Sequence, residues 1–443
     1  MDPKETNRRD FLKKMVYASA ATAVFPTILS SCSKGANDNI HIAHIGVGSR
    51  GTSTTRNYFL PVPDSRSLAT CDVFTHRRED LAKQISAFYE ENYQKHVYCT
   101  PYPDYREILA RPDIDAVHIS TGDYWHLPMA IEAARAGKHI YLEKPLGLSL
   151  DNMIKLETIM AEKNLIFHYG TQQRSLEHIR KGIEMIKSGK IGVVEKIDIW
   201  APQGDDLPIG SLINEEPPPN LDYDRWLGPA PFKPYSEARV ANTGIFHIYD
   251  YAIGFIAGWG AHPLDIAVWG AKAQISGTGT FTGSGTFFPE DMLFDTISYW
   301  DINISYENGL HIHFVSTNYA DEMRKKLNST NGTTFYGTKG WISLGRGLAA
   351  SNVPELHKEL NVTIYGENNR HGYNFIQTIK GEIEPFNPLD EAILSDCISH
   401  MGNILIRSGK DKIVWDAFNR KIVNYPGLEK EFFHRKLREP YTV

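Results

Sequence analysis

Three glycines near the start of the chain have the spacing of a dinucleotide-binding loop. Gly46, Gly48 and Gly51 stand in the stretch GVGSRG, directly after an alternating apolar segment. In a strand–turn–helix unit the first glycine permits a tight turn, the second lets a pyrophosphate approach the main chain, and the third allows close packing of helix on strand. We expect these glycines, with Ser49 and Arg50 of the same loop, to hold a dinucleotide cofactor.

An acidic residue follows this loop at the distance that such a site requires. Asp72 ends the next apolar segment, residues 67–72, and lies 21 positions after Gly51. A carboxylate there suits the ribose hydroxyls of adenosine, and it favours NAD over NADP because a 2′-phosphate would meet a negative charge. Arg77 and Arg78 lie just downstream and keep NADP possible; a solvated turn is the other interpretation of these two arginines.

A lysine ends a later apolar segment, at a place where a substrate can meet the cofactor. Residues 139–142 run into Glu143, Lys144 and Pro145. Ligands of doubly wound sheets bind beyond the carboxyl ends of the strands. We therefore expect Lys144 to hold a substrate hydroxyl or carbonyl beside the nicotinamide and Glu143 to contact the cofactor; a surface lysine in a turn is the alternative.

The elements that must position these residues alternate between short strands and helical stretches, which predicts a parallel sheet covered by helices. After about residue 170 longer strands and the hairpin signal Asn308-Gly309 predict an antiparallel sheet with helices on one side. The expected class is α/β, with a doubly wound Rossmann domain over 39–170 and a C-terminal α/β domain with a large, open, mostly antiparallel sheet over 171–443. Strands are expected at 40–45, 67–72, 115–120, 139–142, 196–200, 296–300, 301–306, 310–314 and in a hairpin over 335–344, and helices at 79–90, 128–136 and 176–186.

The composition is that of an ordinary globular protein. Hydrophobic residues make up 42% of the 443 residues, charged residues make up 23%, and the net charge is −6. This balance gives no sign of a nucleic-acid binder and leaves neutral small molecules such as sugars and polyols open as ligands.

Residues 1–38 have the pattern of an export signal and linker. The stretch from Asn7 to Lys14 resembles a twin-arginine signal, and an uncharged apolar stretch follows that is too short to span a bilayer comfortably. It ends in Leu29-Ser30-Ser31-Cys32, which resembles a bacterial lipobox. We expect export and lipidation of Cys32, and hence a periplasmic or membrane-anchored lipoprotein; cleavage elsewhere and an uncleaved tail are the alternatives.

The remaining cysteines and a pair of histidines do not predict a metal site. Cys71, Cys99 and Cys397 are too widely spaced for a disulfide framework or a metal cluster, so we expect small buried residues. His311 and His313 share one face of a strand, but no third ligand stands at a suggestive spacing.

Several longer motifs resemble the Gfo/Idh/MocA oxidoreductases, the relatives of glucose–fructose oxidoreductase and inositol dehydrogenase. The resemblance covers nearly all of residues 40–443. The family includes exported members with Arg-Arg signals. It implies a Rossmann domain followed by an α/β domain whose large sheet makes oligomer contacts, so a homodimer or homotetramer is expected. Its motifs are GVGSRG, AVHISTGDYWHLPMAIEAARAGKHIYLEKP at 116–145, GTQQRS at 170–175, LDYDRWLGPAP at 221–231, GWGAHPLD at 258–265 and HMGNILIRSGKDKIVWD at 400–416.

The resemblance also implies chemical roles. In the family, the lysine matched by Lys144 orients the substrate and relays protons, and the histidine matched by His262 acts as general acid and base. The family pattern places an Asp four residues before that histidine, and here Gly258 stands in its place. Asp265, three residues after His262, is our candidate for a compensating acid on the same helical face; a structural partner is its other interpretation.

Further substrate and cofactor contacts follow from the same resemblance. Asp123 and His126 stand where the family has Pro-Asn, at the end of a strand, and are expected near the nicotinamide together with Thr121. Tyr124 and Trp125 either stack on a sugar ring or pack in the core. Arg174 either contacts the substrate or forms a surface salt bridge.

Three functions remain open on this basis. The first is an exported NAD-dependent oxidoreductase that acts on a sugar, glycoside or polyol hydroxyl. The second is an NAD-dependent glycosidase or lyase that oxidises a sugar transiently and eliminates the glycosidic bond. The third is a non-catalytic member that keeps the cofactor only for folding.

Overall fold

The computed structural model describes residues 39–204, 213–317, 327, 329–360 and 370–443. Cys32 and the expected signal over 1–38 lie outside these described residues, so export and lipidation stay predictions. Among the helices of the described residues, none is long and apolar enough to cross a membrane.

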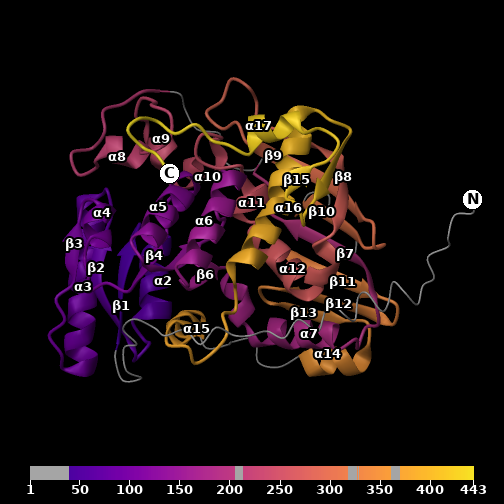
Figure 1. Ribbon diagram of the computed structural model, residues 1–443, viewed down its shortest axis with the longest axis horizontal. Coiled ribbons are helices and arrows are strands. Elements are labelled where there is room, and N and C mark those ends of the chain that lie inside the picture. The colour runs from indigo at the N-terminus through magenta and orange to yellow at the C-terminus, as the bar shows by residue number, and fades with distance from the viewer. Residues whose placement is uncertain (1–38, 205–212, 318–326, 328, 361–369) are drawn as a thin grey trace, which may run out of the picture. The chain divides into compact units, whose positions relative to one another are not determined.

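The N-terminal part of the described chain builds a parallel sheet of six strands (Figure 1). The strand order β3-β2-β1-β4-β5-β6 reverses between β1 and β4, and ligands of such sheets bind beyond the strand ends at that reversal. The parallel Rossmann sheet expected from the sequence is thereby confirmed. Its strands are β1 (Ile40–Ile45), β2 (Ser65–Cys71), β3 (Thr100–Tyr102), β4 (Ala116–Ile119), β5 (His139–Glu143) and β6 (Phe167–Gly170).

Helices cover both faces of this sheet and differ from expectation at their ends. The helix expected from residue 128 begins at Asp123, directly after Gly122, so that Pro128 lies inside it. The strand β3 was not expected, because three residues carry no periodicity that a sequence reading can detect. The helices are α2 (Ser49–Thr54), which continues as a π-helix over Thr55–Phe59, α3 (Thr75–Tyr93), α4 (Tyr105–Leu109), α5 (Asp123–Arg135) and α6 (Leu150–Glu162).

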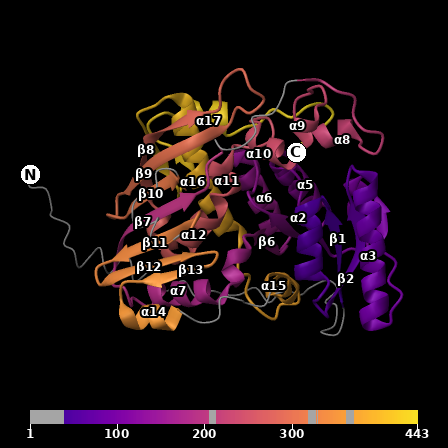
Figure 2. The ribbon, with the colours of Figure 1, turned by 180° about the vertical axis from the view of Figure 1, so that it is seen from behind.

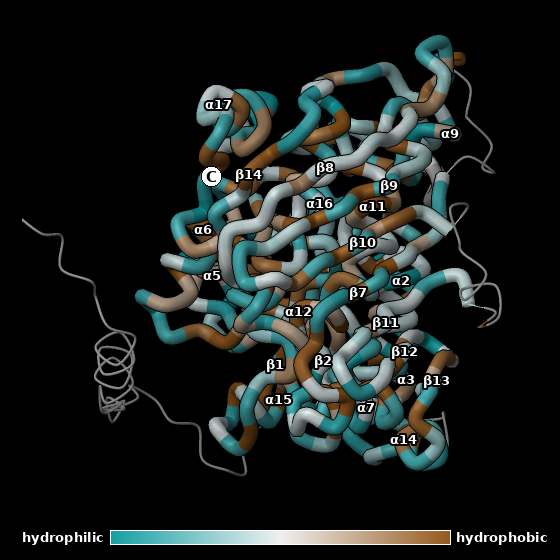
Figure 3. The backbone as a smooth tube through the Cα atoms, turned by 90° about the vertical axis from the view of Figure 1, so that its right-hand side faces the viewer, coloured by the Kyte–Doolittle hydropathy of each residue, from teal (hydrophilic) through white to brown (hydrophobic). Residues whose placement is uncertain are grey.

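The C-terminal part contributes a sheet of nine described strands, which Figure 3 shows from the side opposite the Rossmann sheet. The order is β13-β12-β11-β7-β10-β9-β8-β14-β15, and of these described pairings only β10 with β7 is parallel. The segments expected at 296–300 and 301–306 form one strand, β9. The strands are β7 (Val194–Ala201), β8 (Thr278–Phe287), β9 (Ile297–Tyr306), β10 (His311–Ser316), β11 (Gly332–Gly337), β12 (Gly340–Gly345), β13 (Leu348–Ser351), β14 (Lys412–Asp416) and β15 (Lys421–Ile422).

Long helices fill the space between the two sheets, as both ribbon views show (Figures 1 and 2). The helix α16 (Leu389–Ser408) contacts β6 of one sheet and β8 of the other. Beside it, α12 (Ala261–Ile275) packs on β7 and β11, and α7 (Glu177–Lys187) packs on β12. Cys71, Cys99 and Cys397 are free and buried, as expected. This shared core fixes the second sheet against the carboxyl ends of the Rossmann strands.

Candidate active site

The glycine loop has the steric requirements expected of it. Gly46 has a φ of +80°, and a Cβ there would lie 2.5 Å from the carbonyl oxygen of Ser120. A Cβ at Gly51 would lie 1.9 Å from the carbonyl oxygen of Gly46, so packing forbids a side chain at both positions. A Cβ at Gly48 would meet its nearest atom, Nη1 of Arg77, only at 3.5 Å, so this glycine keeps the main chain open rather than relieving a clash.

Asp72 is fixed at the end of β2 by the main chain around it. Its Oδ2 accepts a hydrogen bond of 2.9 Å from the amide of Val47, and its Oδ1 accepts one of 2.9 Å from the amide of Phe74. Burial raises the pKa of Asp72, while these bonds and Arg77 oppose the rise. Arg78 donates to the carbonyl oxygen of Asp72 at 3.0 Å, and Arg77 is the one of the two arginines that lines the cleft.

One cleft joins the glycine loop and Asp72 to Lys144, and its volume is about 340 Å³. It runs along the carboxyl ends of the Rossmann strands, where the strand order reverses. Most of the residues singled out from the sequence line it, namely Gly46, Gly48, Ser49, Arg50, Gly51, Asp72, Arg77, Thr121, Asp123, Tyr124, Trp125, His126, Glu143 and Lys144. His262, Asp265 and Arg174 do not belong to this lining.

Lys144 points toward the position at which the family acid is absent. Its Nζ donates a hydrogen bond of 2.7 Å to the carbonyl oxygen of Gly258. Burial lowers the pKa of Lys144, and the carboxylates of Asp123 and Glu143 oppose that shift. A lysine whose amine form is accessible can exchange a proton with a substrate oxygen.

Glu143 is buried beside Lys144 and is held on one side only. Its Oε1 accepts from Nε2 of Gln172 at 2.7 Å and from Oγ1 of Thr54 at 3.1 Å, and Nε of Arg50 lies 3.3 Å away. Its Oε2 is buried without a hydrogen-bond partner. A buried oxygen of this kind calls for a ligand donor, since an unpaired buried carboxylate oxygen is costly.

His262 lies next to the cleft and is 3% exposed. Its ring packs at 6.0 Å between centroids from the ring of Trp259, which does line the cleft, and its Nδ1 has no hydrogen-bond partner. Burial and the charge of Lys144 lower the pKa of His262 well below its usual range. The imidazole is therefore neutral, and its surroundings disfavour the protonated form.

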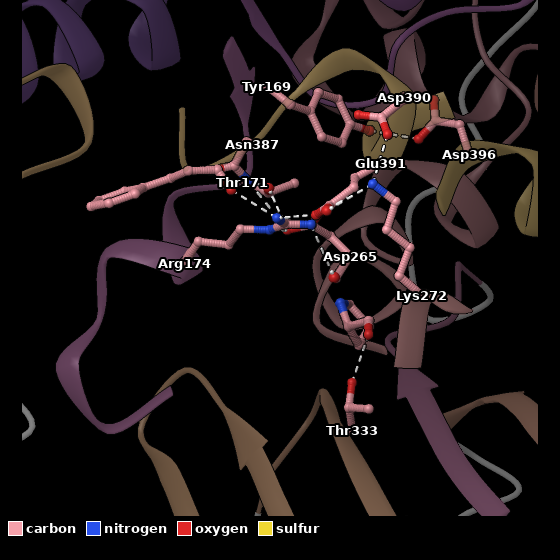
Figure 4. Close-up of polar contacts among 12 residues, drawn as sticks. Tyr169, Thr171, Arg174, Asp265, Lys272, Thr333, Asn387, Asp390, Glu391 and Asp396 are labelled. Carbon is pink, nitrogen blue, oxygen red and sulfur yellow. Dashed lines mark hydrogen bonds and ion pairs between the residues drawn. The ribbon is translucent and has the colours of Figure 1, made fainter. Parts of the chain in front are cut away.

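Arg174 and Asp265 form a buried ion pair, which agrees with the structural alternative left open for Asp265. Nη2 of Arg174 lies 2.5 Å from Oδ1 of Asp265, and both side chains are 1% exposed. Nη1 of Arg174 also reaches Glu391 at 2.5 Å, and Oγ1 of Thr171 donates to Asp265 at 2.7 Å (Figure 4). This buried network ties the end of β6 to α12 and α16. Asp265 is thus turned toward Arg174 instead of replacing the acid absent at Gly258, and the salt bridge of Arg174 is buried, not on the surface.

The aromatic pair after β4 is packed, although both rings reach the cleft. The hydroxyl of Tyr124 and Nε1 of Trp125 donate to the carbonyl oxygen of Trp226, at 2.5 Å and 3.2 Å. Nearby, His126 lies between two carbonyl oxygens, with Nδ1 2.6 Å from that of Pro145 and Nε2 3.1 Å from that of Thr121. His126 therefore joins the ends of β4 and β5, and burial lowers its pKa to about 4.

Some lining residues were not singled out as candidate site residues. Tyr441 and Tyr105 carry no signal in the sequence, and Trp226 stands in the family motif at 221–231; the tertiary fold brings all three to the cleft. The two strand histidines expected to be sheet residues are paired across the sheet, His311 with Ser305 and His313 with Asp301. Among the described residues no cluster of three or more metal-ligating side chains is found.

Comparison with known families agrees with this geometry. Residues 40–171 match the NAD-binding Rossmann-fold model of the Gfo/Idh/MocA oxidoreductase family, and residues 209–443 match the model of its C-terminal α/β domain. The chain belongs to the Gfo/Idh/MocA family.

Individual members of the family resemble the chain over different lengths. A glycosyl hydrolase family 109 protein of Saccharopolyspora erythraea is 33% identical over 121 residues, which are 27% of this chain and 26% of that protein. A second protein of that name from Shewanella sp. strain ANA-3 is 32% identical over 33% of this chain and 35% of its own length. The chain thus matches about a third or less of these curated relatives.

Solved structures share the fold at low identity. The aldose–aldose oxidoreductase of Caulobacter crescentus, complexed with glycerol, superposes with a TM-score of 0.60 at 16% identity, over 84% of this chain and 98% of that one. The scyllo-inositol dehydrogenase of Lactobacillus casei, with bound NAD(H) and scyllo-inositol, has a TM-score of 0.58 at 16% identity over the same shares.

The residues of the cleft fit NAD, the cofactor of the Gfo/Idh/MocA family. The open main chain at Gly48 leaves room for a pyrophosphate, and Asp72 stands where the ribose hydroxyls of adenosine would reach it. The buried, unpartnered Oε2 of Glu143 lies at the other end, beside Lys144. A cofactor that extends from Asp72 to Lys144 would place its reactive ring next to the lysine.

Proposed function

We propose that this protein is an exported oxidoreductase that acts on a hydroxyl group of a sugar, glycoside or polyol and keeps its NAD bound. The observation that carries this proposal is the single cleft that joins the glycine loop and Asp72 to Lys144. The neutral polyols glycerol and scyllo-inositol, which two solved relatives contain, support the substrate class. Free NAD is scarce outside the cytoplasm, so a bound cofactor would be regenerated by a second substrate.

NAD, Lys144 and His262 have different functions beside the expected nicotinamide position. NAD, when bound, supplies the ring that takes up or returns a hydride. Lys144 holds the substrate oxygen, because its Nζ projects into the cleft and is anchored to Gly258. His262, to which the family resemblance gives the acid–base role, is kept neutral by burial and by the charge of Lys144, and its unpartnered Nδ1 can accept a hydrogen bond from the substrate hydroxyl.

The second candidate is an NAD-dependent glycosidase that oxidises a sugar transiently, eliminates the glycosidic bond and returns the hydride. The glycosyl hydrolase family 109 relatives favour it, although the similarity covers a third or less of their length. The absence of the family acid at Gly258 agrees with altered proton chemistry.

The experiment that separates these candidates uses the purified protein with its resident cofactor. Denaturation should release nicotinamide nucleotide; if none is released and none binds, both functions are wrong. A panel of free sugars, polyols and aryl glycosides then distinguishes an oxidised product from a released aglycone.

We further propose that the protein assembles as a homodimer or homotetramer, which size-exclusion chromatography would test. We also propose that Cys32 anchors the protein to a membrane, which mass spectrometry of the N-terminus would test.

A further inference from the structure

Asp123 carries a buried carboxyl group that the scheme above does not use. It is the first residue of α5, it is 2% exposed, and it lines the cleft. Its Oδ2 is buried and has no hydrogen-bond partner. A buried carboxyl oxygen without a hydrogen-bond partner destabilises the fold, so its presence in a cleft indicates a functional role or a bound ligand.

Two charged or titratable groups act on this carboxyl group from other parts of the fold. Lys144 follows β5, and its charge opposes the effect of burial, which raises the pKa of Asp123 above its usual range. Asp396 on α16 adds to that rise. Asp396 is itself occupied, since its oxygens accept from the hydroxyl of Tyr169 and from the amide of Leu146, each at 2.6 Å. Asp123 is therefore the member of this acidic pair that is open to the cleft.

The other acid beside Lys144 has more partners. Glu143 pairs with Arg50 and accepts two further hydrogen bonds at Oε1. Asp72 also lines the cleft, but its two oxygens are occupied by main-chain amides. Asp123 combines a buried oxygen without a hydrogen-bond partner, a place in the lining of the cleft and a charge interaction with Lys144.

We propose that Asp123 is the proton-accepting acid of this site and stands in for the family acid that Gly258 lacks. The proposal rests on the oxidoreductase function stated above. During oxidation of the substrate, its C–H and O–H bonds break and a C=O bond forms. The hydride carries the electron pair to NAD, the amine of Lys144 takes the hydroxyl proton, and the ammonium passes a proton to Oδ2 of Asp123. Contacts of this kind commonly tighten only when the substrate is bound.

The space around Gly258 allows a direct test of whether Asp123 replaces the family acid. At Gly258 a Cβ would lie 3.5 Å from Phe246 and 3.6 Å from Phe255, which are ordinary contact distances, and no positive φ is recorded there. Gly258→Asp can therefore restore the family acid without a clash at Cβ. The isosteric Asp123→Asn removes the proton acceptor while keeping the volume of the side chain.

The experiment compares the holoprotein with Asp123→Asn, with Asp123→Asn/Gly258→Asp and with the control Asp151→Asn. Asp151 is an exposed aspartate in the first turn of the neighbouring helix α6. On a sugar that the unmodified protein oxidises, Asp123→Asn should lower kcat about 100- to 10,000-fold and alter the pH profile of kcat/KM, with NAD still bound. The double variant should recover at least about tenfold of that loss. Wild-type rates and pH profile in Asp123→Asn, or loss of bound NAD in that variant, would overturn the proposal.

A second readout needs no substrate and so separates this proposal from the proposed function. Infrared difference spectra of the NAD-loaded protein should show a carboxyl group that titrates at about pH 8, above that of Asp396, whose pKa burial raises to about 7. That signal should disappear in Asp123→Asn and persist in Asp151→Asn. Its persistence in Asp123→Asn would overturn the assignment even if no sugar is oxidised, whereas failure of the sugar panel alone counts against the proposed function.

Discussion

The side-chain amino group of Lys144 donates a hydrogen bond to the main chain of Gly258, with 2.7 Å between Nζ and the carbonyl oxygen. Gly258 thus still contributes a partner to the lysine at the position where the family pattern has an acid, but a carbonyl oxygen accepts a hydrogen bond and takes no proton. The lysine therefore keeps a hydrogen-bond partner at this position but needs another group to take up its proton. This relationship makes Lys144 the first residue to test.

Replacing Lys144 by Met should abolish most of the turnover without releasing the cofactor. Methionine keeps the apolar stem but removes the group that holds the substrate oxygen, so we expect kcat/KM to fall by about 100-fold or more. Steady-state kinetics and the nucleotide content of the purified variant would measure this. The control is Lys163→Met, an exposed lysine outside the cleft, and equal activity of the two variants would contradict the role of Lys144.

Asp72→Asn should weaken the binding of NAD more than that of NADP. The charged acceptor for the ribose hydroxyls is lost, and a hydrogen bond to a charged group is worth about 1.5–3 kcal/mol, so we expect about 10- to 100-fold weaker NAD binding. NADP should lose less, because the repulsion of its 2′-phosphate disappears at the same time. Titration calorimetry of the cofactor-free protein with both nucleotides would test this, and an unchanged ratio of the two affinities would contradict it.

Alanine should have different effects at two glycines of the loop: at Gly51 it should prevent folding, and at Gly48 it should prevent cofactor binding. Gly51→Ala would put a Cβ 1.9 Å from the carbonyl oxygen of Gly46, so we expect loss of folded protein. Gly48→Ala places its Cβ 3.5 Å from the nearest atom, so the fold should survive while the added methyl group obstructs the pyrophosphate. Circular dichroism and nucleotide content measure the two effects separately; a stable Gly51→Ala protein with bound NAD would contradict the steric argument.

The sequence predicts the cofactor end of the site better than the substrate end, for a physical reason. Gly46, Gly51 and Asp72 act through local main-chain geometry, so their spacing along the chain encodes their function. The surroundings of Arg174 and Asp265 depend on three elements that meet in space, and no local pattern distinguishes a buried ion pair from a substrate contact. Short elements such as β3, and the two strands that merge into β9, were similarly beyond a reading of periodicity.

Breaking the buried ion pair should destabilise the fold and leave substrate recognition intact. Asp265→Asn leaves the fully buried guanidinium of Arg174 with Glu391 as its remaining carboxylate partner, and removing one member of a buried pair costs up to about 3–5 kcal/mol of unfolding free energy. The exposed pair Lys190–Glu359 provides a matched control, and Glu359→Gln should change stability by about 0.5 kcal/mol or less. Urea unfolding would measure both. A raised KM with unchanged stability in Asp265→Asn would instead place Asp265 in the substrate site.

Acid should destabilise the protein through histidines that are buried in neutral form. Burial lowers the pKa of His44 and of His371 to about 3 from a usual value of 6.5. Between these values the unfolded chain binds more protons than the folded one, so the contribution of each histidine is fully present above about pH 6.5 and is lost as the pH falls toward 3. For one such histidine the loss between pH 6.5 and pH 5 is about 2 kcal/mol.

The variant His44→Gln tests this sign directly, because glutamine offers polar atoms near Ser67 Oγ, which lies 2.8 Å from Nε2 of His44, but does not titrate. Its stability at neutral pH should be lower than that of the unmodified protein, and the gap should narrow by about 1–2 kcal/mol as the pH is lowered from 6.5 to 5. Urea midpoints at a series of pH values would measure the gap. A gap that stays constant with pH would mean that His44 gains no proton on unfolding, and a gap that widens would reverse the direction of its pKa shift.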